Sequence, residues 1–214
     1  MNCKGCIFDL DGVIVDTAKY HYLAWKRLAS EMGFDFTEKD NERLKGVSRM
    51  RSLDILLEVG GKTVPEDKKE ALAAKKNNWY VEYISKMDKS EILPGVENFF
   101  KTLKANNIKI ALGSASKNSM LILNNLGLTD YFDAIIDGNK VSKAKPDPEV
   151  FTLAAKEMNL SPSECVVFED AQAGIEAAKA GNMKVIAVGS EENLKDFDKI
   201  IPGFEGVGLD LISF

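Results

Sequence analysis

The amino-acid sequence predicts an α/β protein, in which a doubly wound parallel sheet carries an inserted α-helical cap domain. Short apolar segments alternate with helical segments through most of the chain, as in parallel sheets covered by helices on both faces. About a hundred residues separate the first apolar segment from the second, which is far more than one crossover needs and indicates an insertion.

The strands are predicted at five apolar segments that run continuously instead of alternating with polar residues. A continuous run is typical of a strand buried on both faces of the sheet. The segments are residues 6–10, 108–112, 134–137, 165–169 and 184–188. The pattern is less regular after Gly189, and one short additional strand is expected there.

Four helices are predicted beside these strands from their apolar spacing and from the residues at their ends. Pro94-Gly95 precedes the first helix and Gly181 follows the last, as is common at helix boundaries. The predicted helices are residues 96–105, 117–126, 148–158 and 172–180.

The insertion is also predicted to be helical. Gly33, Gly46 and Gly60 end its first three helices, Ser48 is expected to cap the third, and Pro65 to lie in the first turn of the fourth. These helices are residues 18–32, 37–45, 48–59 and 65–87. The expected domains are a core formed by residues 1–15 and 88–214 and a cap formed by residues 16–87.

The composition is that of an ordinary folded protein. The 214 residues are 45% hydrophobic and 29% charged, which supplies enough apolar side chains for a full core. The net charge of −5 gives no sign of a nucleic-acid or membrane partner. Asp9 and Asp11 interrupt the first apolar run before it reaches the length of a signal peptide, so a cytoplasmic location is expected. The three cysteines are then expected to be reduced thiols, with a redox role for the C-x-x-C at residues 3–6 as a minor alternative.

Polar side chains follow the predicted strands at their carboxyl ends, the edge where open parallel sheets bind ligands. Asp9 and Asp11 come at the end of the first strand. Positions two apart in a strand face the same way, so both carboxylates are expected to address one site. The later strand ends contribute Ser114, Ala115, Ser116, Asn118, Lys143, Lys145, Glu169 and Asp170.

Several carboxylates share a small site only when their charge is compensated, because they repel one another strongly. A hard divalent cation with oxygen ligands compensates them, and Mg²⁺ commonly takes one or two carboxylates together with phosphate oxygens. Metal, lysine and hydroxyl groups together can hold a phosphoryl group during transfer. An aspartate in such a site can act as a nucleophile and form an acyl phosphate.

Each feature has a structural explanation when it is taken alone. Asp-x-Asp-Gly is a common turn sequence, Glu169-Asp170 can cap a helix, and Lys145 can be a solvated surface residue. Their joint occurrence, each at a strand end and in this order, favours a phosphoryl-transfer site.

These motifs resemble those of the haloacid dehalogenase-like phosphotransferases over the chain up to about Gly189. Residues 9–13 are similar to the first motif, Ser114 to the second, Lys145 to the third and Glu169-Asp170 to the fourth. The resemblance implies a Rossmann-like core, in which Asp9 becomes a phosphoaspartate and Asp11 is the general acid and base. It further implies that Ser114 and Lys145 grip the phosphoryl group. The implied Mg²⁺ ligands are Asp9, the backbone carbonyl of Asp11, Glu169 and Asp170.

Within this superfamily, four segments resemble the β-phosphoglucomutase family: residues 44–49, 76–77, 113–118 and 169–175. The chain departs from that pattern at Met50-Arg51, where more acidic residues are expected. The resemblance implies interconversion of β-D-glucose 1-phosphate and D-glucose 6-phosphate through β-glucose 1,6-bisphosphate. The implied substrate-binding residues are Thr17, Trp25, Lys45, Gly46, Val47, Ser48, Arg49, Ser52, Lys76, Ser114, Ala115, Ser116 and Asn118.

Basic residues gather in one segment of the predicted cap. Arg43, Lys45, Arg49 and Arg51 stand between positions 43 and 51 without an intervening acid. Such a cluster is usually a solvated face, but opposite a phosphoryl site it is expected to bind a second phosphate. Lys76 is a further candidate.

The single histidine, His21, is expected to have a functional role. Thr17, His21 and Trp25 are four residues apart and so lie along one stripe of a helix that begins close to Asp11. His21 and Lys76 are expected to bring Asp11 into position when the cap closes, whereas Trp25 is expected mainly to pack.

Two other functions remain open. A sugar-phosphate phosphatase would discharge the phosphoaspartate to water, while a mutase keeps water out and needs a closing lid. A receiver-type signalling domain also carries acids, a hydroxyl and a lysine at strand ends, but has no need of a long helical insertion. The expected partner is a small sugar phosphate, and a monomer is expected because the cap must move.

Overall fold

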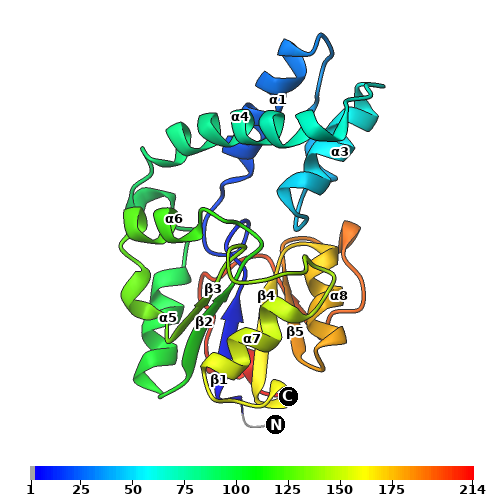
Figure 1. Ribbon diagram of the computed structural model, residues 1–214. Coiled ribbons are helices and arrows are strands. Elements are labelled where there is room, and N and C mark those ends of the chain that lie inside the picture. The colour runs from blue at the N-terminus through cyan, green and yellow to red at the C-terminus, as the bar shows by residue number, and fades with distance from the viewer. Residues whose placement is uncertain (1–2) are drawn as a thin grey trace.

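The computed structural model describes residues 3–214 and confirms the predicted fold class. Six parallel strands form one sheet in the order β3-β2-β1-β4-β5-β6, with helices on both faces (Figure 1). The strands are β1 Gly5–Phe8, β2 Lys109–Gly113, β3 Ala134–Ile136, β4 Cys165–Glu169, β5 Lys184–Val188 and β6 Lys199–Ile201. The short strand predicted after Gly189 is β6, which pairs with β5.

The first strand is shorter than predicted. β1 ends at Phe8, so Asp9 and Asp11 lie in the loop after it, and the argument that places them two apart along a strand is wrong. The backbone N–H of Asp9 still donates to the carbonyl of Phe168 at 3.0 Å, and the chain then turns at Gly12, whose φ is +79°. A turn, not the strand, therefore brings the two carboxylates together.

Alternate residues of the strands build two hydrophobic clusters, one on each face of the sheet. Phe8 and Phe168 pack on one face against α5, whereas Ile7 and Val167 pack on the other against α7 and α8. The core helices are α5 Val96–Ala105, α6 Ser119–Leu126, α7 Glu149–Glu157 and α8 Gln172–Ala180. Two of the four predictions match these bounds, the prediction for α6 begins two residues too early, and that for α7 is one residue too long at each end.

Four helices lie together beyond the carboxyl ends of the strands (Figure 1). They are α1 Ala18–Glu31, α2 Glu38–Glu42, α3 Arg49–Val59 and α4 Glu66–Ile84, and we use the name cap for them and their loops. α4 packs against α1 and α3. Short 3₁₀ turns complete the fold at η1 Lys89–Glu91, η2 Thr129–Tyr131, η3 Pro162–Glu164, η4 Glu191–Asn193 and η5 Leu209–Ile212. The exact division of the chain at residues 16 and 87 stays a prediction.

The ends of the cap helices follow local capping chemistry. The Ser48 hydroxyl accepts from the backbone N–H of Arg51 at 3.3 Å, which confirms Ser48 as the cap of α3. Pro65 stands one position earlier than predicted, at the N-cap of α4 and not in its first turn. α2 is shorter than predicted and is capped by Thr37, whose backbone and hydroxyl pair with Asp40.

Two chain segments join the cap to the core, and they lie side by side. Val15 and Ile92 form an antiparallel bridge, and the Leu93 N–H donates to the carbonyl of Ile14 at 2.9 Å. Beside this bridge, Lys19 Nζ and Tyr20 OH donate to the carboxylate of Glu91 at 2.6 and 2.7 Å. We call this pair of segments the hinge.

Two further findings concern the cysteines and the helices. Cys3, Cys6 and Cys165 are free thiols, as expected. Among the described helices, none combines the length and the apolar character needed to cross a membrane.

The aromatic cluster beneath the sheet gives a test of the packing. Phe168 stacks on Phe8 with ring centroids 4.6 Å apart and also packs edge-on against Phe99. Phe168→Ala leaves a cavity there and is expected to lower the free energy of unfolding by about 3–5 kcal/mol, measured by urea titration. Leu23→Ala, at a side chain that is half exposed, is the control, and equal midpoints for the two variants would contradict the assignment of this cluster to the core.

Candidate active site

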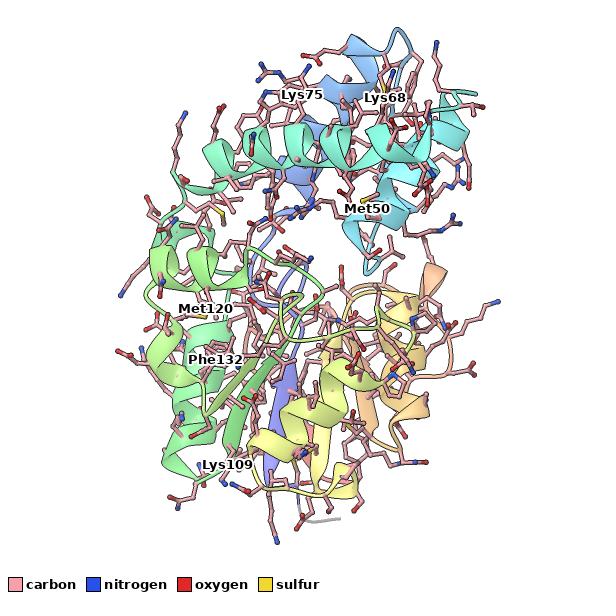
Figure 2. All side chains as sticks on the ribbon, in the orientation of Figure 1. Met50, Lys68, Lys75, Lys109, Met120 and Phe132 are labelled. Atoms are coloured by element: carbon pink, nitrogen blue, oxygen red, sulfur yellow. The ribbon has the colours of Figure 1, made fainter. Side chains whose placement is uncertain are left out.

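A cavity of about 580 Å³ lies between the carboxyl edge of the sheet and the cap. Loops of the core form one wall and the segments around α1, α3 and α4 form the other. Met50, at the start of α3, lies on the side of the cap that faces the core (Figure 2). The predicted site residues that line this cavity are Asp9, Asp11, His21, Trp25, Lys45, Gly46, Val47, Ser48, Arg49, Ser52, Lys76, Ser114, Ala115, Ser116, Asn118, Lys145 and Asp170.

Lys145 links two of the acids on the core side of the cavity. Its ammonium group donates to Asp9 Oδ1 and to Glu169 Oε1, both at 2.6 Å, and all three side chains are buried. Burial alone would lower the pKa of Lys145, but the two carboxylates outweigh it and raise the pKa above its ordinary value. Lys145 is therefore charged and compensates part of the acidic cluster.

Glu169 lies behind the cavity and does not line it. Its second carboxylate oxygen accepts from the backbone N–H of Ala171 at 2.7 Å. A Cβ placed at Gly174 would overlap this carboxylate, so the glycine leaves room for it. In this arrangement Glu169 holds Lys145, and its implied role as a metal ligand stays a prediction.

Asp11 faces the cavity beside Asp9. Its backbone N–H donates to Asp9 Oδ2 at 3.1 Å, and its carboxylate accepts from the hydroxyl of Thr17. Burial, followed by the charge of Asp9, raises the pKa of Asp11 to about 8. A carboxyl group with this pKa can deliver a proton near neutral pH. Thr17 itself is fully buried and does not line the cavity.

Among the described residues, the Asp170 carboxylate has no ion pair with a lysine, since Lys145 pairs with Asp9 and Glu169. Burial and the charges of Glu169 and Asp9 raise its pKa well above the ordinary value. Asp170 packs so closely on the preceding loop that a Cβ at Gly12 would lie 2.1 Å from its carboxylate oxygen. Within the described residues, no three acid, histidine or cysteine side chains are already arranged as a metal centre.

The donor set nevertheless fits Mg²⁺. This ion usually keeps several waters and takes only one or two carboxylates, so it has no need of a preformed cage of three side chains. Asp9 and Asp170 supply two carboxylates beside the backbone carbonyl of Asp11, and a cation there would favour the ionised form of Asp170, which burial and the neighbouring acids disfavour. The residues present are therefore compatible with the implied metal.

The loop after β2 presents hydroxyl groups to the cavity. The Ser114 hydroxyl accepts from the Ser116 N–H at 3.1 Å, and the Ser116 hydroxyl accepts from the Asn118 N–H at 3.2 Å. Because each hydroxyl oxygen is used as an acceptor, its own proton is left to donate to a ligand. Such donors suit the oxygens of a phosphoryl group.

The cap wall carries a pair formed by the half-buried His21 and the buried Lys76. His21 Nδ1 and Lys76 Nζ are 2.8 Å apart, and the ammonium lies over the rings of Trp25 and Tyr80 at 4.5 and 4.7 Å. Burial lowers the pKa of both groups well below their ordinary values, and the charge of Arg49 adds to the effect. Trp25 thus packs, as predicted, and also supports Lys76.

The basic segment of the cap divides between two surfaces. Lys45 and Arg49 line the cavity. Arg43 and Arg51 are exposed and both pair with Glu58, at 3.2 and 3.3 Å. The prediction that all four residues act as one phosphate-binding cluster is therefore wrong for Arg43 and Arg51.

Some residues of the site were missed by sequence reasoning. Asn41 lines the cavity from α2, and Tyr80 stacks on His21 with ring centroids 4.1 Å apart. Tyr80 stands four residues after Lys76 and so shares its helix face, a spacing that was available in the sequence. Asn41 gave no comparable signal, because α2 is too short to show a periodic pattern.

Comparisons with known proteins agree with this geometry. The family model for haloacid dehalogenase-like hydrolases matches residues 3–182. The chain is 41% identical over 211 residues to a β-phosphoglucomutase of Bacillus subtilis, covering 98% of the chain and 93% of that protein. It is 33% identical over 186 residues to a phosphorylated carbohydrates phosphatase of Thermotoga maritima, covering 86% and 83%. A crystal structure of β-phosphoglucomutase from Clostridium difficile superposes with a TM-score of 0.93 at 46% identity, covering 98% and 95% of the two chains.

Gly46 gives a test of the contact between cap and core. Its φ is +70°, and a Cβ there would lie 2.9 Å from the Cβ of Ala171 in the core. Gly46→Ala is expected to hold the two walls apart and to reduce turnover roughly 10- to 100-fold, because small displacements of reacting groups are costly.

The matched control is Gly61→Ala, at a glycine of the cap with φ +58° and no atom within 4 Å of the added Cβ. It carries the same backbone strain, about 1–2 kcal/mol, without the contact to the core. Steady-state turnover and thermal midpoints are measured for both variants. If the two lose activity equally, the closeness of Gly46 to Ala171 has no catalytic importance.

Proposed function

This chain belongs to the haloacid dehalogenase-like hydrolase family, as its four motifs predicted, and we propose that it acts as an isomerase of β-D-glucose 1-phosphate and D-glucose 6-phosphate. One observation carries the proposal: a single cavity joins the Asp9, Asp11 and Lys145 wall to the cationic side chains of Lys45 and Arg49. A cavity with phosphoryl-transfer groups on one wall and two cationic side chains on the other suits a sugar that carries two phosphates. The similarity to β-phosphoglucomutases over nearly the whole chain supports this reading.

The first half-reaction starts from the enzyme phosphorylated on Asp9. The O6 hydroxyl of β-glucose 1-phosphate attacks phosphorus, so that the O6–P bond forms and the bond to Asp9 breaks. Asp11 takes the proton of O6, and the product is β-glucose 1,6-bisphosphate. Lys145, 2.6 Å from Asp9 Oδ1, stabilises the carboxylate that is released.

The second half-reaction runs in the opposite sense after the bisphosphate has turned around in the cavity. The carboxylate of Asp9 attacks the phosphorus on O1, the O1–P bond breaks, and Asp11 returns its proton to O1. Glucose 6-phosphate leaves and the phosphorylated enzyme is restored. The raised pKa of Asp11 fits a group that must carry a proton between the two steps.

The proposed metal is Mg²⁺, held by Asp9, Asp170 and the backbone carbonyl of Asp11, with Glu169 as a further predicted ligand. When bound, it would offset the negative charge that the carboxylates and the phosphoryl oxygens bring together. Ser114 and Ser116 donate to those oxygens, and Lys145 keeps Asp9 aligned.

The cap has two tasks in this proposal. Lys45 and Arg49 bind the phosphate that is not being transferred, and Arg49 does so from a partly desolvated position in which its pKa is lowered by burial. Lys76, whose charge acts on Asp11, and its hydrogen-bond partner His21 help to set the position of this carboxyl group when the cap closes. Closure also excludes water, which would otherwise hydrolyse the phosphoaspartate.

The alternative function is a Mg²⁺-dependent sugar-phosphate phosphatase, because the chain is also similar to a phosphatase acting on phosphorylated carbohydrates. A receiver-type signalling domain is disfavoured by the family assignment and by the cap. The cytoplasmic location and the monomeric state stay predictions.

The reaction products distinguish the mutase from the phosphatase. Protein mixed with β-glucose 1-phosphate, Mg²⁺ and a trace of β-glucose 1,6-bisphosphate is expected to form glucose 6-phosphate, measured with a coupled dehydrogenase. Inorganic phosphate is assayed in the same samples, and chelation of the metal is expected to stop the reaction. Phosphate as the main product would replace the mutase proposal with the phosphatase.

The nucleophile is tested with Asp9→Asn, which keeps the shape of the side chain but removes its charge. Turnover is expected to fall by about 10³-fold or more, because no phosphoenzyme can form. Mass spectrometry after incubation with the bisphosphate is expected to find a phosphoryl adduct on the wild type alone. Asp35→Asn, at an exposed position of the cap, is the control, and substantial turnover by Asp9→Asn would rule out the phosphoaspartate mechanism.

A further inference from the structure

A hydrogen bond crosses the cavity between two asparagines. Asn118 Nδ2 donates to Asn77 Oδ1 at 2.9 Å. Asn118 precedes α6 in the core, and Asn77 belongs to α4 of the cap, one residue after Lys76. Both side chains line the cavity, so the bond joins its two walls directly.

The position of this bond separates it from the other polar contacts between cap and core. For the described residues, the remaining side-chain hydrogen bonds of this kind are those from Thr17 to Asp11, from Lys19 and Tyr20 to Glu91 at the hinge, and from Asn125 to the carbonyl of Ile84, the last residue of α4. All of these lie close to the two segments that join the cap to the core. Asn77 lies seven residues before Ile84, which is about 10 Å along the helix axis. The asparagine pair therefore joins the cap to the core away from its points of attachment.

Once Asn118 is bonded to Asn77, only some of its hydrogen-bond donors are left for a ligand. Its backbone N–H is already used by the Ser116 hydroxyl. Its side-chain amide has two N–H groups, and Asn77 accepts from one of them. In the part of the chain that the structure describes, no hydrogen bond uses the second N–H, and the Asn118 side chain lines the cavity, so this group is left to donate to a ligand.

We propose that Asn77 is a positioning residue that orients the amide of Asn118 toward a substrate phosphate and thereby couples binding of that phosphate to closure of the cap. The proposal rests on the proposed function, in which Ser116 donates to phosphate oxygens, and on the expectation from the sequence that Asn118 also binds substrate. A phosphate bound to Asn118 favours the closed cap, and the closed cap favours the bound phosphate by the same factor, since such coupling is reciprocal.

The test compares Asn77→Ala with Asn78→Ala. Asn78 is the next residue of α4, has the same side chain and is exposed, so the two substitutions change helix propensity equally. Asn77→Ala is expected to raise KM for β-glucose 1-phosphate about five- to tenfold, the equivalent of one ordinary hydrogen bond, while kcat changes less. It is also expected to increase the share of turnovers that end in inorganic phosphate, because the loosened cap admits water. Asn78→Ala is expected to match the wild type in both respects.

A double-mutant cycle separates positioning from a general loss of structure. If Asn77 acts through Asn118, Asn77→Ala has no further effect on KM in a chain that already carries Asn118→Ala. Thermal midpoints accompany all the variants. Additive effects on KM, or equal KM values for Asn77→Ala and Asn78→Ala, would overturn the proposal.

Failure of the proposed function would appear separately, in the wild type. A wild-type protein that releases phosphate and forms no glucose 6-phosphate would not be a mutase, yet KM for each variant can still be measured from phosphate release. The comparison between Asn77 and Asn78 therefore decides the positioning role under either activity.

Discussion

The buried ammonium group of Lys145 is the contact on which the acidic edge of the sheet depends. It bridges Asp9 after β1 and Glu169 at the end of β4, and so it neutralises charge exactly where two adjacent strands end. Removing one partner of a buried ion pair leaves an uncompensated charge, which is far more costly than the loss of a surface pair. The alignment of Asp9 and the packing of the sheet edge are thus maintained by the same three side chains.

The remaining acids are arranged around this contact. Asp11 hydrogen-bonds to Asp9 through its backbone, and Asp170 packs against Gly12 on the same loop. The site therefore has more carboxylates than its lysine can neutralise, and the proposed cation would compensate the remaining charge when a phosphoryl group binds. On the opposite wall, the basic segment of the cap places two cationic side chains, Lys45 and Arg49, against the cavity.

The sequence predicted the structure well where a single requirement, such as burial on both faces of the sheet, decides the residues of a segment. Residues 165–168 form a short continuous apolar run, which suits a strand buried on both faces, and β4 has the predicted bounds of residues 165–169. The polar residues that follow the strands predicted the core wall of the cavity, because the carboxyl ends of parallel strands meet at one edge of the sheet.

The direction of side chains in the cap was harder to predict. Arg49 and Arg51 point in directions about 200° apart around the axis of α3, so Arg49 faces the cavity while Arg51 reaches Glu58. Which of the two faces the cavity depends on the rotation of α3 about its own axis, and this cannot be read from the spacing of the two arginines. Hydrogen bonds across the cavity, such as that between Asn77 and Asn118, depend on how the cap packs on the core, and a local sequence pattern does not predict this packing.

The hinge has a further consequence for how this architecture can change. The chain leaves the core at Val15 and returns at Ile92, and these two residues are paired with each other. The entire cap is consequently one continuous insertion whose two ends are already neighbours, and none of the described strands lies within it. An insertion of another length or sequence between the same two points would leave the pairing of β1 with β2 and β4 as it is, and with it the contacts of Lys145 with Asp9 and Glu169. We therefore expect the helices above the cavity to diverge more freely in evolution than the acidic wall below it.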